Sequence, residues 1–146
     1  MRLTRYTDYA LRVMIHLGVN EGRLVSIAEI ARAYDISQNN LMKVVQDLGQ
    51  AGFVETIRGR AGGIRLARPA TEINVGRLVR HTEAGFMVAD CAHCPIAPAC
   101  GLTGVFAEAI QAFLGVLDRY AVADLLDQRS QLAALLARTV EPCGGE

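Results

Sequence analysis

Apolar residues recur at helical spacing in three consecutive stretches near the start of the chain. Between residues 8 and 17 they share one face, and Thr7 is predicted to cap this first helix. Ser26 and Glu29 form a capping-box pattern at the start of a short second helix. Ser37 is predicted to cap a third helix, which has a polar first turn and an apolar face. Two short helices joined by a tight turn predict a helix-turn-helix.

The pattern then changes from helical spacing to strict alternation. Residues 53–57 and 64–67 alternate apolar and polar positions, and the glycine-rich segment 58–63 lies between them. This arrangement predicts a β-hairpin, or wing. Asn74 is predicted to cap a further helix that ends near residue 83. Residues 1–84 are therefore expected to form a winged helix-turn-helix domain.

The second half of the chain has a different pattern. Residues 85–101 contain three cysteines and two prolines and are predicted to be a loop. Apolar residues then recur every three or four positions from 102 to about 126, which predicts one long helix. Its apolar arc is wide, so we expect it to pair with a second copy of the chain; packing back onto its own domain is the alternative. A short helix is predicted at 131–138, followed by a flexible tail at 139–146.

The predicted fold is thus mainly α with a small β-hairpin, with residues 102–138 holding the dimerisation helix and a C-terminal helix. The composition agrees with a folded domain, since 51% of residues are apolar and 21% are charged. Stretches of about 20 uninterrupted apolar residues, as a membrane span requires, do not occur. No secretory leader is recognised, so a cytoplasmic location without membrane contact is expected.

A formal net charge of zero at first argues against a nucleic-acid partner. The charges are, however, unevenly distributed. Residues 1–80 carry twelve Arg and Lys against seven Asp and Glu, whereas residues 81–146 carry three against eight. The first half therefore has a charge of +5 and the second half −5, and the densest basic stretch is 58–80. Such asymmetry favours a polyanion-binding first half.

The predicted recognition helix presents residue types that read double-stranded DNA. Gln and Asn can pair bidentately with adenine in the major groove, Ser can reach a base or a phosphate, and Lys can contact phosphate. The same residue types are common in ordinary helix caps, so the combination with a basic wing carries the prediction. The candidates in the helix are Ser37, Gln38, Asn39, Asn40 and Lys43, and those in the wing are Arg58, Arg60 and Arg65.

Cys91, Cys94 and Cys100 form a C-x2-C-x5-C pattern within ten residues. In a reducing cytosol such a group favours metal binding over disulfides, and thiolates favour iron–sulfur clusters or zinc. An iron–sulfur cluster, a structural zinc ion and metal-free redox thiols all remain open on this pattern alone. Either metal centre needs one more ligand. The candidates for it are Asp8, His81, His93 and Cys143.

Three segments together resemble one protein family. They are MRLTRYTDYALRVMIHL, ISQNNLMKVVQDLGQAGFVETIRGRAGGIRLARP and CPIAPACGL, and the similarity extends from residue 1 to about 136. They resemble the iron–sulfur winged-helix transcriptional regulators that include IscR, RirA and NsrR, with the greatest likeness to the nitric-oxide-sensing members.

The resemblance implies a homodimeric repressor that binds an inverted-repeat operator and is not an enzyme. It implies that Cys91, Cys94 and Cys100 hold a cluster and that Asp8 of the partner subunit is the fourth ligand. It also implies nitric oxide as the signal. A [4Fe–4S] cluster is favoured. The first two cysteines are separated by fewer residues than is usual in the family, so a [2Fe–2S] cluster remains an alternative.

Three other functions compete with this hypothesis. A regulator that senses iron or cluster supply is the nearest alternative, because it belongs to the same family. A zinc-stapled winged-helix adaptor would be colourless. An iron–sulfur electron carrier or a thiol oxidoreductase would leave the basic hairpin without a role.

Overall fold

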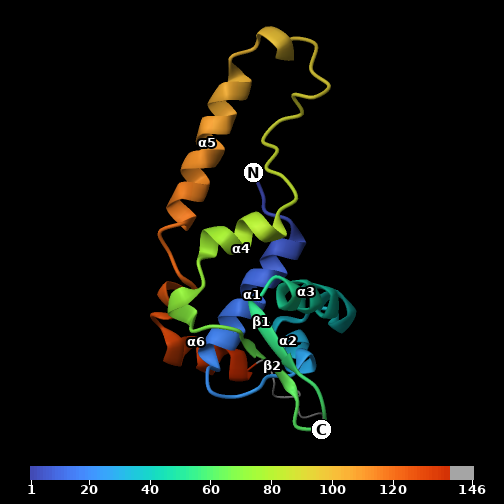
Figure 1. Ribbon diagram of the computed structural model, residues 1–146, viewed down its shortest axis with the longest axis vertical. Helices are drawn as coiled ribbons and strands as arrows, with labels where there is room; N and C mark the ends of the chain where they lie inside the picture. The colour runs from blue at the N-terminus through green and yellow to red at the C-terminus, as the bar shows by residue number, and fades with distance from the viewer. Residues whose placement is uncertain (139–146) are drawn as a thin grey trace.

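The computed structural model describes residues 1–138, and it is mainly helical with one two-stranded antiparallel sheet (Figure 1). The predicted tail at 139–146 lies outside the described residues. The elements in chain order are α1 (Arg5–Val19), α2 (Ile27–Tyr34), α3 (Gln38–Gln50), β1 (Val54–Ile57), β2 (Gly63–Leu66), α4 (Val75–Thr82), α5 (Leu102–Leu117) and α6 (Arg129–Arg138), with 3-10 turns at Ala70–Glu72, Ala97–Ala99 and Val122–Leu126.

The first helix begins earlier than the sequence pattern indicated. Thr4 is the N-cap of α1, and its hydroxyl accepts a hydrogen bond of 3.3 Å from the backbone N–H of Thr7. Thr7 itself is buried in the first turn, so its assignment as the cap was wrong. Ser26 caps α2 as predicted, with its hydroxyl 3.1 Å from the backbone nitrogen of Glu29. The Glu29 carboxylate binds Arg23 instead, so Ser26 forms its half of the capping box and Glu29 does not form the other.

One hydrophobic core holds the helix-turn-helix and the wing together. The strands pair antiparallel with Val54 opposite Leu66, and an isolated bridge joins Val25 to Ile64. Most of the core residues come from α1, α2, α3 and the hairpin. The largest fully buried side chains include Met14, Ile30, Leu41, Leu48 and Ile64. The core therefore fixes α3 against a rigid base.

The long helix predicted from 102 to about 126 is shorter in the structure, because α5 ends at Leu117. The chain then pairs with the segment before α4: the backbone N–H of Val75 donates to Tyr120 at 2.9 Å, and that of Val122 donates to Ile73 at 2.8 Å. These bonds replace helical ones. Val122 and Leu126 enter the main core, which explains why their spacing continued the helical pattern.

The segment that links α4 to α5 extends away from this body. In Figure 1 the loop after α4 rises to the far end of the molecule, and α5 returns toward the body. Among residues 86–117, Leu114 alone is buried. It packs with Val75 and Val79 of α4 in a small second cluster. The inner end of α5 is thus attached to the body, and its outer end has little intrachain cover.

Candidate functional site

The first turn of α3 presents its polar residues to solvent. Ser37, Gln38, Asn39, Asn40 and Lys43 are all exposed, whereas the apolar residues Leu41, Val44, Val45 and Leu48 are buried against the core. Ser37 is the N-cap residue of α3, as predicted, but its hydroxyl makes no cap hydrogen bond. The outer face of α3 is therefore available to hydrogen-bond a partner.

The wing carries its arginines at the tip and on one strand. Arg58 and Arg60 are exposed beside Gly59, whose φ of +112° is a conformation that favours glycine. The Arg65 guanidinium is less available to bind a partner molecule, because its Nε lies 2.8 Å from a carboxylate oxygen of Glu55 on the paired strand. The two tip arginines have no such partner among the contacts of the described residues.

The three cysteines lie in a series of tight turns before α5. The backbone N–H of Cys94 donates to Cys91, and that of Cys100 donates to Ala97. All three thiols are half-buried and free of disulfides. Within residues 1–138, no three Cys, His, Asp or Glu side chains lie together as a metal-binding group. The loop of one chain therefore supplies thiols that are close in sequence without forming a closed site.

The candidates for a fourth ligand are already engaged in one chain. Asp8 forms an ion pair with Arg12, with contacts of 3.0 and 3.1 Å, and about half of each side chain is exposed. His93 is exposed and its Nδ1 lies 2.9 Å from Asp90. His81 contacts Asp47 of α3 through its Nε2. Cys143 lies outside the described residues.

Hydrogen bonds join the first turn of α1 to the last turn of α4. The Glu83 carboxylate accepts from the Thr4 backbone N–H at 2.7 Å and from the Thr4 hydroxyl at 2.9 Å. One turn further along, the Thr7 and Thr82 hydroxyls are 2.9 Å apart. Burial alone would raise the pKa of Glu83, but the nearby Thr7 side chain and the hydrogen bonds from Thr4 hold it below its ordinary value. Glu83 therefore stays charged at the N-terminus of α1, where a negative charge is favourable.

The same two helix ends also contact the recognition helix. On α3, one carboxylate oxygen of Asp47 accepts from the Tyr6 hydroxyl at 2.6 Å and lies 3.0 Å from His81 Nε2. The His81 ring also packs against Phe53, with ring centroids 5.7 Å apart. Burial and the Asp47 carboxylate raise the pKa of Tyr6 to about 12. This contact is not predictable from local sequence patterns, because its three members come from separate segments.

A winged helix-turn-helix with an exposed polar recognition helix and an arginine-tipped hairpin defines a DNA-binding transcriptional regulator. No helix among the described residues is long and apolar enough to cross a membrane. Residues 3–128 match the model of the Rrf2 family, described as iron-dependent transcriptional regulators. The chain belongs to this family.

Similar proteins agree with this assignment. The chain is 49% identical over 142 residues to the transcriptional regulator NsrR of Bacillus subtilis, covering 93% of this chain and 97% of that protein. It is 47% identical over 143 residues to NsrR of Bacillus licheniformis, covering 94% and 100%. The structure of IscR from T. potens has a TM-score of 0.73 at 26% identity and covers 88% of each chain. The family and both NsrR proteins are described as transcriptional regulators, and the chain is accordingly not an enzyme.

Proposed function

We propose that the protein is a homodimeric repressor whose operator binding is controlled by an iron–sulfur cluster that reacts with nitric oxide. The observation that carries this proposal is the group of three free thiols, Cys91, Cys94 and Cys100, on the loop between the winged helix-turn-helix and α5. The likeness to regulators named NsrR supports nitric oxide as the signal.

An uncovered apolar stripe on α5 supports the dimer. Leu102, Val105, Ala109, Ala112 and Val116 are all exposed. They alternate spacings of three and four, which is the repeat of a helix-pairing seam. The buried residue Leu114 lies on a different face. Small residues in the middle of the stripe would let a second α5 approach closely.

The donor set fits an iron–sulfur cluster. Three thiolates suit iron, and a hard carboxylate would be a weaker fourth ligand than a thiol. Cys91, Cys94 and Cys100 would hold the cluster, with Asp8 of the partner subunit as the fourth ligand. A [4Fe–4S] cluster is favoured and a [2Fe–2S] cluster is the alternative. When bound, the cluster would supply iron centres with which nitric oxide combines.

The contacts at the ends of α1 and α4 offer a physical route from the cysteine loop to DNA. Hydrogen bonds join the first turn of α1, which carries Asp8, to the end of α4, which leads into the cysteine loop. They are formed by Thr4, Thr7, Thr82 and Glu83. Tyr6 and His81 in turn contact the same carboxylate oxygen of Asp47 on α3. A shift of the start of α1 or of the end of α4 would therefore move the contacts that position the recognition helix α3. The cluster must favour the DNA-binding arrangement energetically to control it.

The DNA-contacting surface follows from exposure and charge. We infer that the first turn of α3 enters the major groove and that the wing tip contacts phosphate or a narrow minor groove. Pairing through α5 would place two recognition helices about one helical turn apart, so an inverted-repeat operator is expected. The contributing residues are Ser37, Gln38, Asn39, Asn40, Lys43, Arg58, Arg60 and Arg65.

The test begins with anaerobically purified protein. A broad brown absorption, together with loss of operator binding when nitric oxide is titrated, is expected. Cys100→Ala should abolish both the cluster spectrum and operator-specific binding. A Cys100→Ala protein that still binds the operator specifically would refute cluster control.

The family description as iron-dependent regulators favours iron or cluster supply as the second candidate signal. Operator binding that survives several equivalents of nitric oxide but is lost on iron chelation would establish that alternative. Colourless protein with about one zinc per chain would instead indicate a zinc-stapled adaptor.

A further inference from the structure

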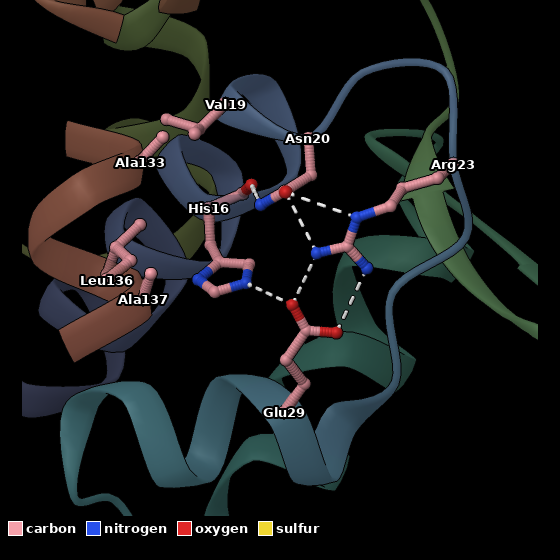
Figure 2. Close-up of a pocket in the computed structure, with 8 residues that line it drawn as sticks. All are labelled: His16, Val19, Asn20, Arg23, Glu29, Ala133, Leu136 and Ala137. Atoms are coloured by element: carbon pink, nitrogen blue, oxygen red, sulfur yellow. Dashed lines mark hydrogen bonds and ion pairs between the residues drawn. The ribbon is translucent and has the colours of Figure 1, made fainter. Parts of the chain in front are cut away.

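A hollow of about 290 Å³ is lined by residues of α1, α2 and α6 (Figure 2). In Figure 1, α6 lies at the opposite end of the molecule from the loop between α4 and α5. We propose that the hollow is a binding site for a compact, neutral, mostly apolar molecule that carries one hydrogen-bond donor. The inference is independent of the cluster and of the signal proposed above.

His16 provides the polar contact inside the hollow. Its side chain is 2% exposed, and its Nε2 lies 3.3 Å from a carboxylate oxygen of Glu29. Arg23 donates to both oxygens of the same carboxylate, at 2.5 and 3.1 Å, and these bonds hold the pKa of Glu29 below its ordinary value. Because an ionised carboxylate can only accept, Nε2 must carry the proton of the neutral imidazole.

The other ring nitrogen is therefore a fixed acceptor. His16 Nδ1 is buried and has no hydrogen-bond partner within residues 1–138. In Figure 2 it points away from Glu29 toward Leu136 and Ala137 of α6. Burial lowers the pKa of His16, so the ring is neutral near pH 7 and its lone pair is available. A buried acceptor without a partner is costly, and a donor on a bound molecule would satisfy it.

The rest of the lining sets the size and polarity of the occupant. Val19 of α1 and the side chains of Ala133, Leu136 and Ala137 from α6 form an apolar wall. Two of these residues are alanines, which leave space between α6 and His16. Arg23 and Glu29 already neutralise each other, so the hollow has no unpaired charge to attract an ion. These features favour a small hydroxyl compound with an apolar body.

Phenol is a suitable probe and toluene is its control, since the two have similar shapes and only phenol has a hydroxyl group. Full-length protein labelled with nitrogen-15 at histidine is titrated with each compound, and the ring nitrogens are followed by NMR. The chain has three histidines, so His81 and His93 serve as internal references. A saturable shift of His16 Nδ1 with phenol, with little change for toluene, is expected.

Substitutions on α6 locate the site. Ala133→Leu fills the hollow and should weaken phenol binding at least tenfold. Ala134→Leu is the matched control, because Ala134 is exposed on the same helix and does not line the hollow. The proposal is overturned if phenol gives no saturable shift at His16, if toluene shifts Nδ1 equally, or if Ala133→Leu binds phenol as well as the unmodified chain does.

Discussion

The body of the molecule and the segment 86–117 differ in how they are stabilised. Residues 1–82 form a continuous core with α1 at its centre, and Val122 and Leu126 complete it from the other end of the chain. The segment 86–117 contributes one buried residue, Leu114, although most residues of α5 are apolar. Hydrophobic burial within one chain can therefore account for the stability of the body, whereas the outer part of α5 and the cysteine loop need further contacts to be stable.

The largest expected effect tests the body. Leu48→Ala removes a fully buried side chain from α3 and should lower the free energy of unfolding by about 2–5 kcal/mol. Leu102→Ala is the matched substitution at the outer end of α5, where the side chain is 47% exposed. It should change the free energy of unfolding of the isolated monomer by less than about 0.5 kcal/mol. Denaturant unfolding at low protein concentration measures both, and equal losses would contradict the contrast between the two regions.

The next effect tests the uncovered stripe of α5. Val105→Lys places a charge in the centre of the exposed apolar face and should dissociate the proposed dimer. Operator affinity should then fall about 100-fold, because each winged domain would bind its half-site alone. Gln111→Lys puts the same charge on the polar side of α5 and should leave the dimer intact. Analytical ultracentrifugation and operator titration give the two readouts; a dimeric Val105→Lys protein would exclude this stripe as the interface.

The same contrast explains which features of the fold the sequence predicts and which it does not. Elements with local signals were predicted: Ser26 and Asn74 cap their helices, and alternation located both strands. The end of α5 was missed because its periodicity continues into Val122 and Leu126, which instead face the main core. Tertiary contacts at Asp118 end the helix. The Asn74 side chain donates to the backbone carbonyl of Asp118, and Arg80 forms an ion pair with the Asp118 carboxylate. Local periodicity cannot report such contacts.

Site residues follow the same division. The polar turn at residues 37–40 and the arginines at the wing tip are visible in the sequence because each set is contiguous, and the structure exposes both. The contacts around Asp47 could not be predicted, since Tyr6, Asp47 and His81 meet only after folding. Likewise, the spacing of the cysteines indicates metal chemistry without showing how the thiols converge.

A smaller effect tests the junction between the two regions. Asp47→Asn removes the carboxylate acceptor shared by Tyr6 and His81. It should lower the free energy of unfolding by about 1 kcal/mol, a modest loss because the carboxylate is partly exposed. The pKa of Tyr6 should fall from about 12 toward its ordinary value, which ultraviolet titration of the phenol detects. Asp127→Asn, at an exposed position on the last turn before α6, is the control.

The sign of the pH dependence follows from the raised pKa. Folding favours the protonated phenol of Tyr6, so its contribution to stability is complete below pH 10 and is lost as the pH rises from 10 to about 12. Asp47→Asn should flatten this alkaline loss, whereas Asp127→Asn should retain it. An unchanged Tyr6 titration in Asp47→Asn would show that the carboxylate does not hold the hydroxyl in solution.

The smallest expected effect tests the charge difference between the two regions. Arg60→Ala removes one guanidinium from the exposed wing tip. If it contacts phosphate, the slope of log affinity against log salt should become shallower by about 1, with a similar loss for all DNA sequences. Arg119→Ala removes the same charge from the acidic half, at an exposed position after α5, and should leave the slope unchanged. Fluorescence anisotropy across a salt series distinguishes the two, because equal slopes for both variants would mean that net charge, and not the wing, sets the attraction to DNA.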